Sequence, residues 1–255
     1  MDIVSLLEIY DRAFSQCKGT HQDKAKAASD AVLACFLQHA PEAESLHDEV
    51  SQNVTRYGKV LHFDVSTTND VNYTAFTNEY NKDITIKIKP SVQPDEMNSI
   101  FIHELGEADY IARGLPDIID HRDREIVRGR LIELFSHPHA LSLTKIHQLD
   151  PIELAMRTSR ATTWITHGYV KEYHYKWFIV LMLSWAIVSF PSLLPIREEL
   201  DGYLEHKEFV DQIVSICNAT NTMGTKHEVE IAMQEVIRIL ESLGMEGIEM
   251  KKNSG

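Results

Sequence analysis

The chain has 255 residues, of which 44% are hydrophobic and 25% are charged, so it is long enough and apolar enough to bury a core. Asp and Glu number 38 against 25 Lys and Arg, which gives a net charge of −13. Because nucleic-acid binding depends on basic side chains that neutralise phosphates, this balance argues against a nucleic-acid partner. The N-terminal stretch 1–14 has no basic start and mixes acids with apolar residues, so we do not expect a signal peptide. The three scattered cysteines indicate a reducing compartment, and we expect a cytoplasmic protein.

The first sixty residues predict three helices. Apolar side chains recur at helical spacing in 3–14, and residues 24–40 are rich in alanine, the best helix former, up to Pro41. A third helix is expected over 43–57 and ends at Gly58, because glycine commonly follows a helix C-terminus.

The pattern then changes to strands. Residues 60–66, 71–80 and 84–89 carry β-branched or alternating side chains between polar turn segments. The last of these is the clearest, since Ile84, Ile86 and Ile88 share one face of the strand. Three consecutive strands predict a short β-meander.

Everything downstream predicts helices, which we place at 95–113, 121–136, 138–149, 169–190, 197–216 and 225–243. Pro138 is expected to separate the second helix from the third, and the tail from Gly247 onward is expected to fray. The sequence therefore predicts an α+β protein that is mainly α. We expect one domain over 1–150 and a helical C-terminal subdomain over 151–255.

The segment 177–196 has no charged residue, and two interpretations stay open for it. A membrane-spanning helix needs about 20 apolar residues, but Pro191 and Pro195 end regular helix close to Phe190. A buried core helix over 177–190 is therefore favoured over a helix that enters a membrane or docks a partner.

The residues that suggest a chemistry lie in the predicted helix 95–113. His103 and Glu107 are four residues apart, so an imidazole and a carboxylate project from one helix face and can bind the same metal ion. Glu104 lies about 100° around the helix, close enough to act on a water at that ion without being a ligand.

This segment resembles the active-site helix of the zincin metallopeptidases, whose signature is His-Glu-x-x-His. The resemblance implies that His103 is a zinc ligand and that Glu104 is the general base acting on a metal-bound water. Glu107 stands where the family has its second histidine. A carboxylate remains a legitimate zinc ligand, although it makes manganese or ferrous iron alternatives to zinc.

The third ligand has to come from further along the chain. Arg113 stands where the metzincin branch of the family needs a histidine, which excludes that branch. Glu133 and His137 repeat the four-residue spacing, and the run Glu-x-x-x-His-Pro resembles one found in some zincin-like proteins. His121 with Glu125 is the second choice.

Simpler roles compete with each of these interpretations. His103 with Glu107, and Glu133 with His137, can each be an exposed pair that stabilises a helix by a few tenths of a kcal/mol. His139 and His147 are expected to be surface or interhelical hydrogen-bonding residues rather than ligands.

Two functions follow from different classes of protein. The first is a metal-dependent peptidase that cleaves an intracellular protein or peptide, which the strand over Ile84–Lys89 would bind as an added strand. The second is a catalytically inactive protein of the zincin fold that binds a regulatory partner through the helix at Trp177–Phe190.

Overall fold

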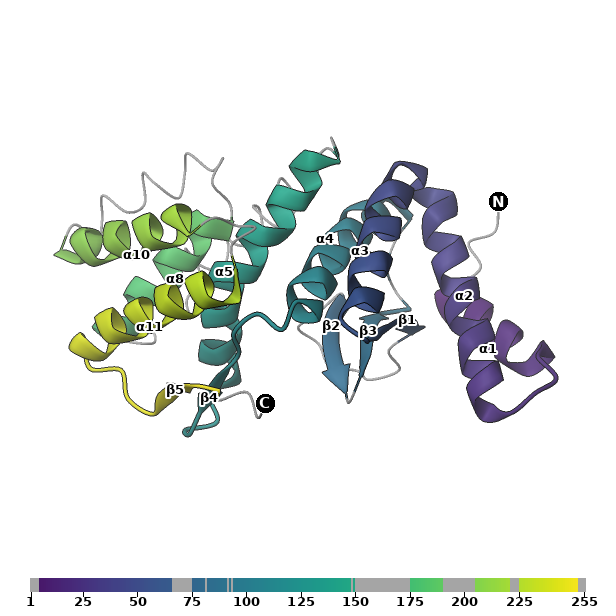
Figure 1. The fold of residues 1–255 in the computed structure, drawn as a ribbon, viewed down its shortest axis with the longest axis horizontal. Coiled ribbons are helices and arrows are strands. Elements are labelled where there is room, and N and C mark those ends of the chain that lie inside the picture. The colour runs from purple at the N-terminus through teal and green to yellow at the C-terminus, as the bar shows by residue number, and fades with distance from the viewer. Residues whose placement is uncertain are drawn as a thin grey trace. The chain divides into compact units, whose positions relative to one another are not determined.

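The computed structural model describes residues 5–65, 75–80, 82–90, 92, 94–147, 149, 175–189, 205–220 and 225–251. Helices dominate these ranges and accompany a three-stranded and a two-stranded sheet, which confirms the α+β, mainly α class (Figure 1). The chain divides into two compact units. The first comprises 1–113 and 143–151, and the second comprises 114–142 and 152–255. The expected division near residue 150 stays a prediction.

The first unit begins with the three helices that the sequence predicts, and one 3-10 turn lies between the second and the third. They are α1 (Leu6–Gln16), α2 (His21–His39), η1 (Pro41–Ala43) and α3 (Glu44–Arg56). The helix α1 starts at a capping box in which Ser5 and Glu8 bond each other's backbone N–H, and Thr20 with Asp23 does the same for α2. Gly58 follows α3 with φ of 70°, the left-handed conformation that a helix C-terminus favours.

The three-stranded sheet does not form the meander that the sequence predicts. Its strands are β1 (Val60–Val65), β2 (Ala75–Tyr80) and β3 (Asp83–Ile88), and their order is β1-β3-β2. The strand β3 pairs parallel with β1 and antiparallel with β2. Ile84, Ile86 and Ile88 are fully buried, so the most apolar strand takes the centre and the more polar β2 takes an edge. The prediction that β3 receives a substrate as an added strand is therefore wrong, because both of its edges are occupied.

Helix α4 (Pro94–Ala112) packs on this sheet and against α3 (Figure 1). Its apolar stripe faces the core as expected, with Phe101, Leu105 and Ala108 fully buried. Gly114, with φ of 63°, follows its last turn. The sheet and α3 thus fix which face of α4 is left to carry polar side chains.

The second unit contains most of one long helix. The helix α5 (Glu125–Ile146) runs through Pro138, so the prediction that this residue separates two helices is wrong. Proline inside a helix removes one backbone hydrogen bond at a cost of about 3 kcal/mol. Buried Leu131, Leu134 and Leu143 on both sides of it supply apolar contacts that offset this cost. The last turn of α5 belongs to the first unit, so this helix is part of both.

In the described part of the second unit, α5 is accompanied by further helices and a small sheet: β4 (Ile118–Asp120), α8 (Lys176–Ser189), α10 (Lys207–Ala219), α11 (Lys226–Ser242) and β5 (Ile248–Met250). The strand β5 pairs antiparallel with β4, so the prediction that the chain frays from Gly247 is wrong for these three residues. The predicted helical stretches 169–174 and 197–204 lie outside the described residues.

The apolar stretch that begins at Trp177 forms a buried helix, as favoured from the sequence. Twelve residues of α8 are buried, including Trp177 and Trp185. Among the described residues, none of the helices has the length and apolar character that crossing a membrane requires. A docking surface along this helix, which the second functional interpretation needs, is not available because its side chains are inside the protein.

Candidate functional site

His103 and Glu107 form a close pair on α4. The Nε2 atom of His103 lies 3.3 Å from Oε1 of Glu107, and the two side chains are only 12% and 19% exposed. An ordinary helix-stabilising pair is open to solvent, and its ionic attraction is weakened by water. These two polar groups are mostly shielded, so their arrangement requires further interactions that satisfy them.

Glu104 is held from the sheet. It is 2% exposed, and the hydroxyl of Thr77 on β2 donates a hydrogen bond to its Oε2 atom at 2.7 Å. A buried carboxylate is costly unless such donors compensate for lost water. The hydrogen bond therefore holds the Glu104 carboxylate against the edge strand of the sheet. Glu104 is the residue directly after His103 in the sequence.

A buried carboxylate one turn further along ties α4 to α3. Asp109 is fully buried and accepts hydrogen bonds from Asn53 Nδ2 at 2.8 Å and from Arg113 Nε at 2.6 Å. The ammonium of Lys59 donates to the carbonyl of Ile111 at 2.9 Å. These bonds restrict rotation of the helix about its axis, and they thereby set where His103 and Glu107 point.

The second predicted pair, on α5, has different neighbours. The Nε2 atom of His137 lies 4.0 Å from Oε2 of Glu133, and its Nδ1 atom lies 2.8 Å from the hydroxyl oxygen of Ser189 on α8. The same Oε2 atom of Glu133 accepts a hydrogen bond from Arg130. The guanidinium of Arg130 lies 4.0 Å from the centre of the Trp185 ring, a cation–π contact.

Three of the predicted ligands form a group that can hold a metal ion. His103, Glu107 and His137 each offer one ligand atom for such an ion. Two imidazoles with one glutamate are the donor set of one class of catalytic zinc site. Two atoms bound at about 2.0–2.1 Å to a tetrahedral ion are about 3.3 Å apart, which the His103–Glu107 pair matches. Glu133 is not in this group.

The alternative third ligand His121 is not in this group, and the side chain of its partner Glu125 lies outside the described residues. The imidazole of His121 is 57% exposed and lies 2.9 Å from the carboxylate of Glu249. His147 bonds two side chains of α3, Ser45 at 3.1 Å and Glu49 at 2.7 Å, in agreement with its expected interhelical role.

Thiol chemistry is disfavoured by the surroundings of the cysteines. All three are free, and burial raises the pKa of the Cys217 thiol to about 12. Burial also raises the pKa of Cys35. Because the thiolate is the nucleophile, a raised pKa disfavours reaction of these two thiols near neutral pH.

Sequence reasoning did not identify Thr77, Arg130 or Ser189. Thr77 and Ser189 lie 27 and 52 residues from the side chains that they contact, and no local motif marks them. The contact of Arg130 with Glu133 could have been predicted from the sequence, because a basic residue three positions before Glu133 lies on the same helix face.

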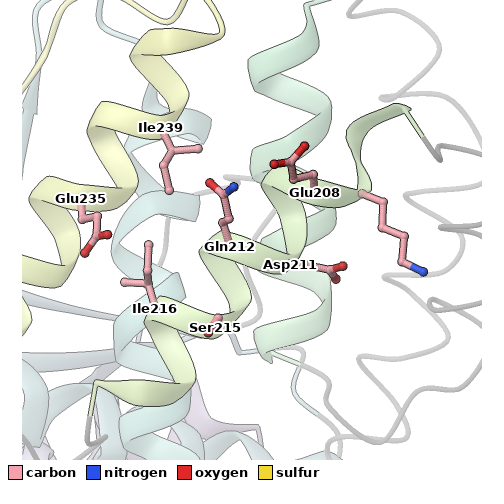
Figure 2. Close-up of a pocket in the computed structure, with 8 residues that line it drawn as sticks. Glu208, Asp211, Gln212, Ser215, Ile216, Glu235 and Ile239 are labelled. Atoms are coloured by element: carbon pink, nitrogen blue, oxygen red, sulfur yellow. The ribbon is translucent and has the colours of Figure 1, made fainter.

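A surface groove of about 730 Å³ lies along α10 and α11 in the second unit (Figure 2). Glu208, Asp211 and Glu235 line it together with Lys207, and all four side chains are exposed. None of the predicted ligands lines this groove, so it has no part in the candidate site.

Comparisons with known proteins give no relative: the chain matches no family model, no curated protein and no solved structure.

Proposed function

We propose that the chain is a metal-dependent peptidase that binds zinc through His103, Glu107 and His137 and acts on a protein or peptide. The observation that carries the proposal is the arrangement on α4: a buried carboxylate, Glu104, directly follows one member of a shielded His–Glu pair. The donor set of two imidazoles and one carboxylate supports zinc over manganese, which is bound more often through oxygen, whereas ferrous iron takes the same donor set and stays an alternative.

When bound, zinc supplies a Lewis acid that polarises a carbonyl and lowers the pKa of water. Glu104 is the general base in this proposal and takes the proton from the attacking water. Its Oε2 atom already accepts from Thr77, so the carboxylate has a fixed orientation before the substrate arrives. Removing a general base typically lowers the rate ~10²–10⁴-fold.

The edge strand β2 suits the substrate better than β3. Within the described sheet, β2 pairs with a neighbour on one side only. An extended peptide can add to such an edge through backbone hydrogen bonds. Since Thr77 lies on β2 and bonds Glu104, a peptide bound along this strand would lie close to the general base.

The test compares three forms of the zinc-loaded chain in a peptide-cleavage assay. We expect Glu104→Gln to lower the cleavage rate at least ~100-fold while zinc content and thermal stability stay close to wild type. The control is Glu235→Gln, which makes the same chemical change at an exposed position in the groove and should leave the rate unchanged. Equal rates for the wild type and Glu104→Gln would contradict the assignment of the base.

The burial of Glu104 favours a second candidate function, a zincin-fold protein that holds a metal but does not cleave peptides. At 2% exposure, this carboxylate has little access to water unless the site opens. Zinc binding without cleavage of any member of a broad peptide library would support this candidate instead.

A further inference from the structure

Glu133 is held next to a proposed ligand but is engaged by a cation. Its Oε2 atom lies 4.0 Å from Nε2 of His137, while the same oxygen accepts from the guanidinium of Arg130. Two ligand atoms of a tetrahedral zinc ion are about 3.3 Å apart, so Glu133 Oε2 would have to approach Nε2 of His137 by less than about 1 Å to share an ion with it.

Two contacts on α8 hold this arrangement in place. The Ser189 hydroxyl oxygen lies 2.8 Å from Nδ1 of His137 and can accept its proton, which leaves the lone pair of that imidazole on Nε2. Trp185 supports the guanidinium of Arg130 at 4.0 Å from the ring centre. With this tautomer the nitrogen that would bind a metal is Nε2, which faces Glu133, and Trp185 supports the guanidinium that engages Glu133.

Whether Glu133 becomes a ligand has a chemical consequence. Structural zinc sites use four protein ligands, whereas catalytic sites use three and keep one position open. Glu133, as a second carboxylate and a fourth protein ligand, would close that position and would strengthen binding of the ion.

We infer that Arg130 is a positioning residue that withholds Glu133 from the metal and so keeps the coordination position open for substrate or water. This inference rests on the proposed function, because it assumes a metal ion bound to His137. It predicts that neutralising Arg130 releases Glu133 to bind, and that the effect disappears when Glu133 cannot bind.

The experiment measures zinc affinity by competition with a chromophoric chelator. We expect Arg130→Gln to bind zinc at least ~10-fold more tightly than wild type, the equivalent of about 1.4 kcal/mol. Glu133→Gln alone, and the double variant Arg130→Gln with Glu133→Gln, should both keep the wild-type affinity. Arg130→Met is a second form of the same test, since its straight apolar chain can still pack on Trp185 if the Gln variant folds poorly.

A second readout reports the open position directly. Cobalt in place of zinc gives absorption bands that change when azide adds to a vacant position. We expect this response in the wild type and its loss in Arg130→Gln.

The outcomes distinguish a failure of the proposed metal site from a failure of the inference about Arg130. A wild-type chain that binds no zinc would overturn both the metal site and this inference. A wild-type chain that binds zinc, with an affinity and azide response that Arg130→Gln and Arg130→Met leave unchanged, would overturn the inference alone.

Discussion

The helices α4 and α5 carry the same chemical pair, an imidazole and a carboxylate one turn apart, in different surroundings. On α4 the two groups are 3.3 Å apart, whereas on α5 they are 4.0 Å apart and the carboxylate is engaged by Arg130. If Glu107 is a ligand and Glu133 is not, as we propose, residue type and spacing are not enough to define a metal ligand. The competing partners of each side chain decide whether it can bind.

The helices also differ in what fixes them. A fully buried carboxylate, Asp109, ties α4 to α3, and contacts with aromatic and hydroxyl side chains tie α5 to α8. A buried charged network is costly to disrupt, because removing one member leaves the others without water or partner. The orientation of α4 should therefore be the more sensitive of the two to a single substitution.

The largest predicted effect breaks this network. We expect Asp109→Ala to lower the free energy of unfolding by about 3 kcal/mol, since Asn53 and Arg113 lose their shared acceptor. The measurement is urea unfolding followed by circular dichroism. Asp30→Ala is the control, because Asp30 is 60% exposed in its pair with Lys26 and should cost less than ~1 kcal/mol. Similar losses for the two variants would show that Asp109 does not anchor α4.

A smaller effect tests whether the carboxylates of Glu107 and Glu133 differ in zinc binding. Glu107→His recreates the His-Glu-x-x-His pattern, and we expect it to tighten zinc binding by about tenfold, or 1.4 kcal/mol. Glu133→Gln, a change to the carboxylate on α5, should leave the affinity within about twofold. Calorimetric titration with zinc checks both variants. An unchanged affinity in Glu107→His would mean that Glu107 does not contact the ion.

The smallest predicted effect is a pH dependence in the second unit. Burial tends to raise the pKa of Asp120, but hydrogen bonds from Arg124 and from the Arg122 backbone outweigh it and lower that pKa. A lowered folded-state pKa gives stability that is present above the unfolded value, about 3.9, and is lost as pH falls through the folded value.

We therefore expect the wild type to lose more stability than Asp120→Asn between about pH 5 and pH 2. Chemical unfolding at several pH values measures the difference. Parallel curves for the two proteins would show that Asp120 does not contribute to acid sensitivity.

The sequence predicted the helices and strands well where local signals are strong. The alanine-rich run 24–40 and the alternation of Ile84, Ile86 and Ile88 depend on near neighbours. The strand order was missed because it depends on contacts between distant segments. Pro138 misled the prediction because burial of its helix neighbours outweighs the local cost.

In the candidate site, too, local features were predicted from the sequence and contacts between distant segments were missed. The spacing of His103, Glu104 and Glu107 was visible in the sequence because one helix positions all three. Thr77 and Ser189 come from other elements, so only the fold brings them to Glu104 and His137.

The most direct test of the central claim is a zinc titration with elemental analysis of the wild type, His103→Ala, His137→Ala and His121→Ala. We predict about one zinc per wild-type chain and a more than ~100-fold weaker affinity when either proposed ligand is removed. His121→Ala removes an exposed imidazole and should bind as the wild type does. A wild type without zinc, or His103→Ala and His137→Ala variants that bind as tightly as His121→Ala, would contradict the account.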